Sequence, residues 1–224
     1  MTQDHNSALA AAAKAVLGPI GCVRKGKSRT WVADHGWWAG LIEFQPSSWS
    51  KGTYLNVGAA WLWHEQDYWS FDDGAGQSGP RVAGFQEARS GGDFRDKARG
   101  LAEIAKRELL ALRARHCSLE ATAKYLASRH DEGIWADYHC GVAAGLTGQR
   151  AVAEERFAAV LVAAPVAPWM EELQVRTREL VGLLGSADMF RAAVEGIILR
   201  TRGLRKLPAL ADIWATHARE SPEE

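Results

Sequence analysis

Residues 37–63 read WWAGLIEFQPSSWSKGTYLNVGAAWLW, and this stretch decides the fold. Apolar residues alternate with small or polar ones from Trp37 to Gln45 and from Thr53 to Trp63, and a period of two is typical of strands that bury one face. The residues that we expect to form the sheet core are Trp38, Ile42 and Phe44 in the strand over 37–45 and Leu55, Val57, Ala59, Trp61 and Trp63 in the strand over 53–63.

Two shorter strands are predicted before this stretch, from Cys22 to Lys25 and from Arg29 to Ala33, because tryptophan, valine and threonine favour strands. Asp34-His35-Gly36 is typical of a hairpin loop, since aspartate and glycine tolerate the positive φ of tight turns. The second and third strands should therefore be antiparallel neighbours. An alanine-rich helix that ends near Leu17 precedes them, and Gly18-Pro19 supply its stop signal.

The character of the chain changes twice after the last of these strands. Residues 66–92 are rich in glycine, serine and aspartate and show little periodicity, which predicts a long loop, either functional or loosely ordered. From Asp93 apolar residues recur at spacings of three and four, as in an amphipathic helix. We expect this helix to close a first domain.

Only helices are predicted after His116. Their approximate ranges are 118–128, 134–147, 150–163, 168–184, 187–202 and 208–217. Ser118 and Ser186 are suitable N-caps, and Pro168 and Pro208 fit the first turn of a helix. The predicted fold class is therefore α+β, an antiparallel sheet with flanking helices followed by an all-helical C-terminal part. We place an α+β domain at 1–115 and a helical domain at 116–224, with the junction between Arg113 and Ser118.

Residues 134–165 resemble a single tetratricopeptide-like helical hairpin. Gly141, Ala153, Phe157 and Pro165 have the spacing at which that repeat places its small, small, aromatic and proline residues. Cys140 and Ala144 depart from the repeat, which has large residues there. An ordinary antiparallel helix pair is the alternative, because close helix crossings in general need small residues.

A second resemblance rests on three stretches: GCVRKG at residues 21–26 followed by Trp31, IEFQPSSW at 42–49, and YLNVG at 54–58. Over roughly residues 10–115 the chain resembles an uncharacterised bacterial family known only as a numbered domain of unknown function. Cys22 stands where we expect that family to have an aromatic residue. The resemblance implies an accessory role, such as immunity to a toxin or conflict with phage, and it implies no catalytic residues.

Charge and cysteine content bear on the ligands that the protein attracts and on the cellular compartment in which we expect it. Lysine plus arginine and aspartate plus glutamate both number 27, so the whole molecule has no net field to attract polyanions or a membrane surface. The three cysteines are odd in number and widely spaced, which fits a reducing compartment. We expect no signal peptide and no transmembrane segment, and a cytoplasmic location.

Motifs for metal or cofactor chemistry are absent from the sequence. No histidine or cysteine pair has zinc spacing, no phosphate-binding loop precedes a helix, and the aspartates of residues 66–92 lack calcium-loop spacing. We therefore predict no metal, no cofactor and no catalytic residue. The cysteines are interpreted as small hydrophobes, and adjacent pairs such as His139-Cys140 as structural.

Tryptophan content favours a protein partner, because tryptophan is enriched at the energetic centres of interfaces and the chain has ten. Gln45, Ser48 and Trp49 follow the third strand, and Asn56 alternates away from the apolar stripe of the fourth. We expect Asn56 and this polar connection to lie together on the face opposite the stripe. Trp49 is either a lid over the core, which we favour, or an exposed anchor for a partner.

A basic cluster supports a second reading. Arg24 and Lys25, with Lys27 and Arg29, lie beside strands that carry tryptophan, and cations near exposed rings suit single-stranded nucleic acid. The main hypothesis is a non-catalytic protein-binding protein. The alternatives are this nucleic-acid-binding protein and an enzyme with a dispersed site. The sequence predicts no oligomeric state.

Overall fold

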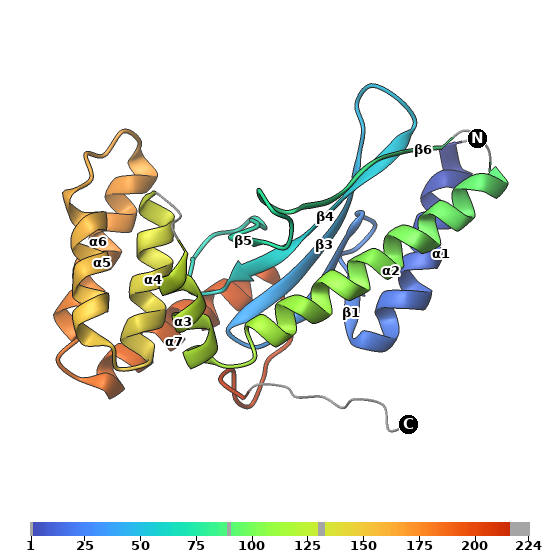
Figure 1. The fold of residues 1–224 in the computed structure, drawn as a ribbon. Coiled ribbons are helices and arrows are strands. Elements are labelled where there is room, and N and C mark those ends of the chain that lie inside the picture. Colours follow the sequence, from blue (N-terminus) through green and yellow to red (C-terminus); the bar gives the residue numbers. More distant parts are fainter. Residues whose placement is uncertain (1, 89–90, 130–132, 216–224) are drawn as a thin grey trace. The chain divides into compact units, whose positions relative to one another are not determined.

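The computed structural model describes residues 2–88, 91–129 and 133–215 and divides into two compact units (Figure 1). Unit 1 holds the described residues up to Trp61, Tyr68–Ala114, and those from Leu210 onward. Unit 2 holds Leu62–Asp67 and Arg115–Ala209. Each unit thus combines segments that are far apart in the sequence. The division into independent domains at 1–115 and 116–224 stays a prediction.

Unit 1 is built on an antiparallel sheet of six strands. These are β1 (Cys22–Arg24), β2 (Thr30–Asp34), β3 (Trp38–Pro46), β4 (Gly52–Trp61), β5 (Asp73–Gly74) and β6 (Arg81–Glu87). The order is β1-β2-β3-β4, and β4 pairs on its other side with both β5 and β6. The sheet followed by helices confirms the predicted α+β class.

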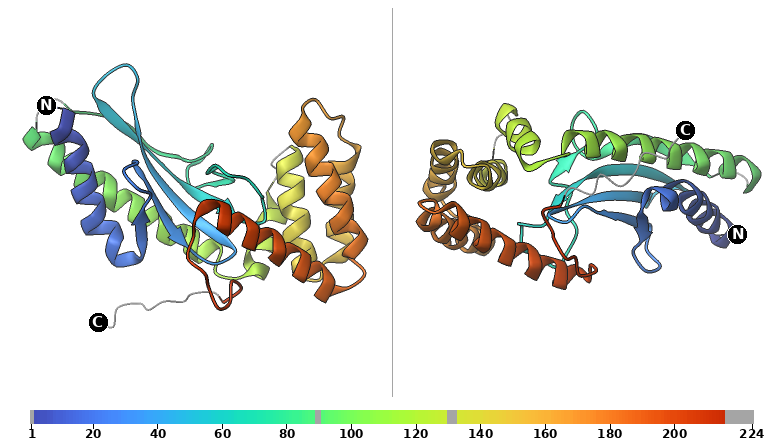
Figure 2. Two further views of the ribbon diagram at one scale, coloured as in Figure 1. Left: turned by 180° about the vertical axis from the view of Figure 1, so that it is seen from behind. Right: turned by 90° about the horizontal axis from the view of Figure 1, so that it is seen from below.

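Two helices, α1 (Thr2–Leu17) and α2 (Gly91–Arg115), pack on the same face of this sheet, and the short 3-10 turn η1 (Gly18–Ile20) links α1 to β1 (Figure 2). The rings of His5 on α1 and Phe94 on α2 are 4.0 Å apart, so the two helices touch. A side chain at Gly40 of β3 would meet Leu109 of α2. The glycine therefore lets α2 lie close to the sheet.

The predicted apolar stripes are the core between this sheet and its helices. Phe44 lies opposite Leu55 and Ile42 opposite Val57 in the β3–β4 register, and all four side chains are buried. The exception is Trp63. β4 ends at Trp61, and Trp63 belongs to unit 2, where its indole Nε1 donates to Nδ1 of His139 at 3.1 Å.

The turn between β2 and β3 forms as the sequence predicts. Gly36 has a φ of +82°, and its amide donates to Oδ1 of Asp34 at 3.0 Å. A side chain at Gly36 would also clash with the carbonyl group of Ile213. Glycine is needed here for both its conformation and its size.

The prediction of one long loop over residues 66–92 is wrong in part, because β5 and β6 lie within this range. β6 has two irregularities in its register with β4, between Thr53 and Leu55 and between Leu55 and Asn56. Such bulges break the period-two pattern. Most side chains of β6 are also only half-buried, so no apolar stripe marked it.

The helix predicted over 208–217 is also wrong for the described residues 208–215, which are irregular; residues 216 and 217 lie outside the described part. Ile213 is buried against the Gly36 turn in unit 1. Burial of this one side chain outweighs a short run of helical propensity, which is a weak preference.

Unit 2 consists of helices α3 (Leu119–Ser128), α4 (Ile134–Leu146), α5 (Arg150–Val162), α6 (Pro168–Leu183) and α7 (Ala187–Arg205). The hydroxyl groups of Ser118 and Ser186 accept from the amides of Ala121 and Met189, as expected of N-caps. Helices α4 and α5 form the predicted hairpin. A Cβ at Gly141 would lie 2.6 Å from the ring of Phe157, so this crossing requires the small residue.

Candidate functional site

The β3–β4 hairpin of unit 1 extends beyond β2, whose pairing with β3 stops at Glu43, and β6 follows β4 as far as Gly52 (Figure 1). Its strands pair as far as Pro46 opposite Thr53, and the chain then turns. The Ser47 hydroxyl accepts from the amides of Trp49 at 3.2 Å and Ser50 at 3.4 Å. These bonds organise the turn, and its last residue is also held from outside the hairpin, since the Lys51 carbonyl accepts from the Ala88 amide at 2.9 Å.

Trp49 lies at this tip with 92% of its surface exposed. The favoured interpretation of Trp49 as a lid over the core is therefore wrong. The reason is the length of the hairpin: because β3 and β4 stay paired to Pro46 and Thr53, the tip begins beyond the buried side chains. Ser48 is exposed beside it.

A polar network covers the neighbouring face of the sheet, opposite the helices. Asn56 of β4 is 5% exposed, and its Nδ2 donates to Oε2 of Glu43 and to Oε1 of Gln45, each at 2.9 Å. Arg81 of β6 donates to Oδ1 of Asn56 and to Oε1 of Gln45, each at 2.7 Å. Three strands thus fix the positions of four polar side chains.

Arg81 also lies over the Tyr54 ring, with its guanidinium carbon 4.1 Å from the ring centroid. The Tyr54 ring also lies 5.3 Å from the ring of Phe85 of β6, centroid to centroid. Stacking and hydrogen bonds together hold the Arg81 side chain in one orientation although it is exposed. The network presents a fixed positive charge, a carboxylate and an aromatic ring on one surface.

Part of this site was predicted from the sequence. Gln45 and Asn56 are brought together as expected, on the face opposite the stripe of Leu55 and Val57. Arg81, which closes the network, was not predicted, because β6 was not recognised as a strand. Glu43 could have been found from its position two residues before Gln45 on the same face of β3.

The basic residues Arg24 and Lys25 lie elsewhere in unit 1, in the β1–β2 hairpin. Arg24 donates to the carbonyl oxygens of Ser28 at 2.7 Å and Lys27 at 3.1 Å. The Lys25 Nζ lies 5.8 Å from the centroid of the Trp69 ring. Neither residue takes part in the network around Asn56.

The nucleic-acid hypothesis needs exposed aromatic rings on which bases can stack, and most of the tryptophans beside the basic cluster are buried. Trp31, Trp37 and Trp38 are all at most 5% exposed, so their faces are not open to bases. Trp61 and Trp63 are buried as well. Among the tryptophans, only Trp49 and Trp169 are exposed large hydrophobics, so the surplus that the count of ten suggested is small.

The histidines next to cysteine or glutamate lie in the interior of unit 2. His139 accepts from Trp63, and Nδ1 of His116 lies 3.2 Å from the Thr122 hydroxyl. The carbonyl oxygen of Trp63 also accepts from the Tyr138 hydroxyl at 3.3 Å. The two bonds of Trp63, to His139 and from Tyr138, anchor the segment Leu62–Asp67 within the helical unit.

The three cysteines are free and differ in exposure. Cys117 is exposed, whereas Cys22 and Cys140 are buried. Burial raises the pKa of the Cys22 thiol to about 12, and the nearby Arg113 charge offsets this only in part. Burial also raises the pKa of Cys140.

We expect one thiol per chain, that of Cys117, to react rapidly with Ellman's reagent at pH 8, because only a thiolate in contact with solvent attacks it. The variant Cys117→Ser should show no rapid phase, and denaturant should then release the two buried thiols. A rapid phase that persists in Cys117→Ser would show that Cys22 or Cys140 is reactive.

Comparison of the chain with models of known families, with curated proteins and with solved structures finds no match. The resemblance to the bacterial domain family therefore stays a prediction, as does the accessory role that it implies. None of the described helices is both long and apolar enough to cross a bilayer.

Proposed function

We propose that this protein binds another protein without catalysis, and that the β3–β4 hairpin of unit 1 makes the central contact. The observation that carries this proposal is the 92% exposure of Trp49 on a tip whose backbone is ordered by Ser47. Exposing a large apolar side chain to water is unfavourable, and its burial by a partner would contribute favourable free energy to binding.

The neighbouring network supports the same surface. Glu43, Gln45, Asn56 and Arg81 are already held by hydrogen bonds, so binding would cost little ordering of their side chains. Tryptophan and arginine are the residues that most often dominate interface energies. The partner that fits this surface offers an apolar pocket for Trp49 and a carbonyl or carboxylate oxygen for Arg81.

The partner can be identified by placing a photo-crosslinking amino acid at position 49 in the native host. The control position is Val162 of α5, which is 82% exposed and belongs to unit 2. We expect a discrete covalent adduct from position 49 only, and mass spectrometry then names the protein. Identical adducts from both positions would show that crosslinking reports random collision.

With that protein purified, Trp49→Ala should weaken binding by about 2 kcal/mol or more, roughly thirtyfold in Kd. Trp49→Phe should recover part of the affinity, and Val162→Ala should bind like the wild type. The melting temperature of Trp49→Ala should stay that of the wild type, because the side chain leaves no cavity. Wild-type affinity in Trp49→Ala would refute the proposed surface.

A further inference from the structure

The first strand of the sheet has an open edge. Among the described residues β1 pairs with β2 alone, with Val23 opposite Val32 and Arg24 opposite Trp31. The Lys25 amide donates to the carbonyl of Thr30 at 2.9 Å, so the Lys25–Thr30 pair is hydrogen-bonded. Because bonded and non-bonded pairs alternate in an antiparallel ladder, Arg24 directs its own N–H and C=O away from β2.

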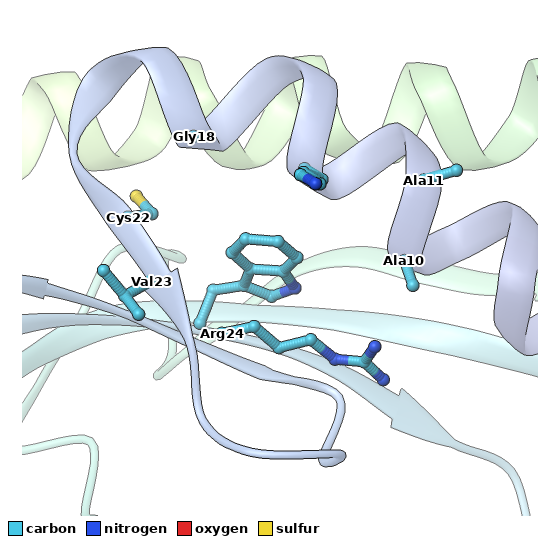
Figure 3. Close-up of a pocket in the computed structure, with 8 residues that line it drawn as sticks. Ala10, Ala11, Gly18, Cys22, Val23 and Arg24 are labelled. Carbon is cyan, nitrogen blue, oxygen red and sulfur yellow. The ribbon is translucent and has the colours of Figure 1, made fainter.

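A groove of about 530 Å³ runs between α1 and this strand (Figure 3). Small residues on α1, Ala10 and Ala11, leave the space, and Cys22 and Trp31 supply apolar surface from the strands. The volume falls in the range of roughly 300–1,000 Å³ that is typical of ligand sites. Figure 3 shows Ala10 and Ala11 on one wall and Cys22 and Arg24 on the other.

The charge around the groove has one sign. Lys14 of α1 and Arg24 of β1 line it, and no acidic side chain does among the residues described. Lys27 and Arg29 add two cations in the same β1–β2 hairpin, although Arg29 also donates to the Asn6 side chain. In a chain with no net charge, this local excess favours an anionic ligand.

We propose that the edge of β1 and this groove bind an extended, acidic peptide segment of a partner protein, which adds a strand to the sheet. The backbone groups of Arg24 would pair with the peptide backbone, as in other complexes formed by strand addition. Side chains on one face of the added strand would meet Lys14 and Arg24 and should be acidic. Those on the other face would cover Val23, which is 70% exposed, and should be apolar.

The open edge of β1 distinguishes a peptide ligand from a small amphipathic carboxylate. A fatty acid would use the apolar groove and the two cations, but it has no backbone to bond the edge of β1. The site is also independent of the proposed hairpin surface, since its residues lie on α1, η1, β1 and β2. Trp49→Ala should therefore leave it unchanged.

The test uses the full chain and a soluble nine-residue peptide of alternating glutamate and valine. Amide exchange is followed by NMR, with decanoate and a peptide with lysine in place of glutamate as the other probes. We expect the acidic peptide to slow exchange of the Arg24 amide about tenfold or more, and the lysine peptide to have no effect. No binding, or binding by decanoate alone, would overturn the proposal.

Two variants separate charge from backbone. Lys14→Glu reverses an exposed charge on α1 without touching the strands, and it should weaken the acidic peptide about tenfold. Arg24→Pro removes the outward N–H and should abolish binding, whereas Arg24→Ala should only reduce it. Thermal melts check that each variant is folded. Equal binding by Lys14→Glu and wild type would refute the charged groove even if both proline and alanine variants were unstable.

Discussion

Replacing Trp37 by alanine should lower the free energy of unfolding of unit 1 by about 3–5 kcal/mol. Trp37 is fully buried, and its ring stacks on Trp61 with centroids 5.9 Å apart and planes 10° from parallel. The truncation removes a large apolar area and leaves a cavity that neighbouring strands cannot close. Urea denaturation followed by circular dichroism measures the change.

Trp49→Ala is the matched control, because it deletes the same atoms from an exposed site. It should change the free energy of unfolding by less than about 0.5 kcal/mol. Similar losses in the two variants would contradict the burial that separates Trp37 from Trp49.

Replacing Phe157 by alanine should destabilise unit 2 by about 3–5 kcal/mol. The ring is fully buried and lies against Gly141, with the rings of Tyr138 and Phe190 at 6.3 and 6.4 Å. Its loss opens a gap where α4 and α5 cross. Val162→Ala, on the same helix but exposed, should have almost no effect.

The two destabilised variants together test the division of the chain. If the units unfold independently, Trp37→Ala should shift one transition and Phe157→Ala the other. A single transition shifted by both variants would show that the chain unfolds as one cooperative body. That result would contradict separate domains at 1–115 and 116–224.

The proposed binding surface includes Asn56, whose position could be predicted from the sequence, and Arg81, whose position could not. Asn56 could be placed opposite the core because its neighbours Leu55 and Val57 alternate with it. Arg81 could not, since its place in the network depends on pairing between β6 and β4, which are far apart in sequence and joined through an irregular register. Irregular pairing leaves no periodic signal.

What the sequence determined by itself is local. Alternation placed the strands β3 and β4 and their buried face, residue preferences placed β1 and β2, Asp34 and Gly36 set the turn, and serine caps fixed where α3 and α7 begin. The tertiary structure alone decided three other features. β6 joins the sheet, and Trp49 projects from the hairpin tip. Residues 208–215 are irregular and not helical, and Ile213 among them is buried. The physical reason is that periodicity and capping act over a few residues, whereas burial and strand pairing depend on segments that meet only in the folded chain.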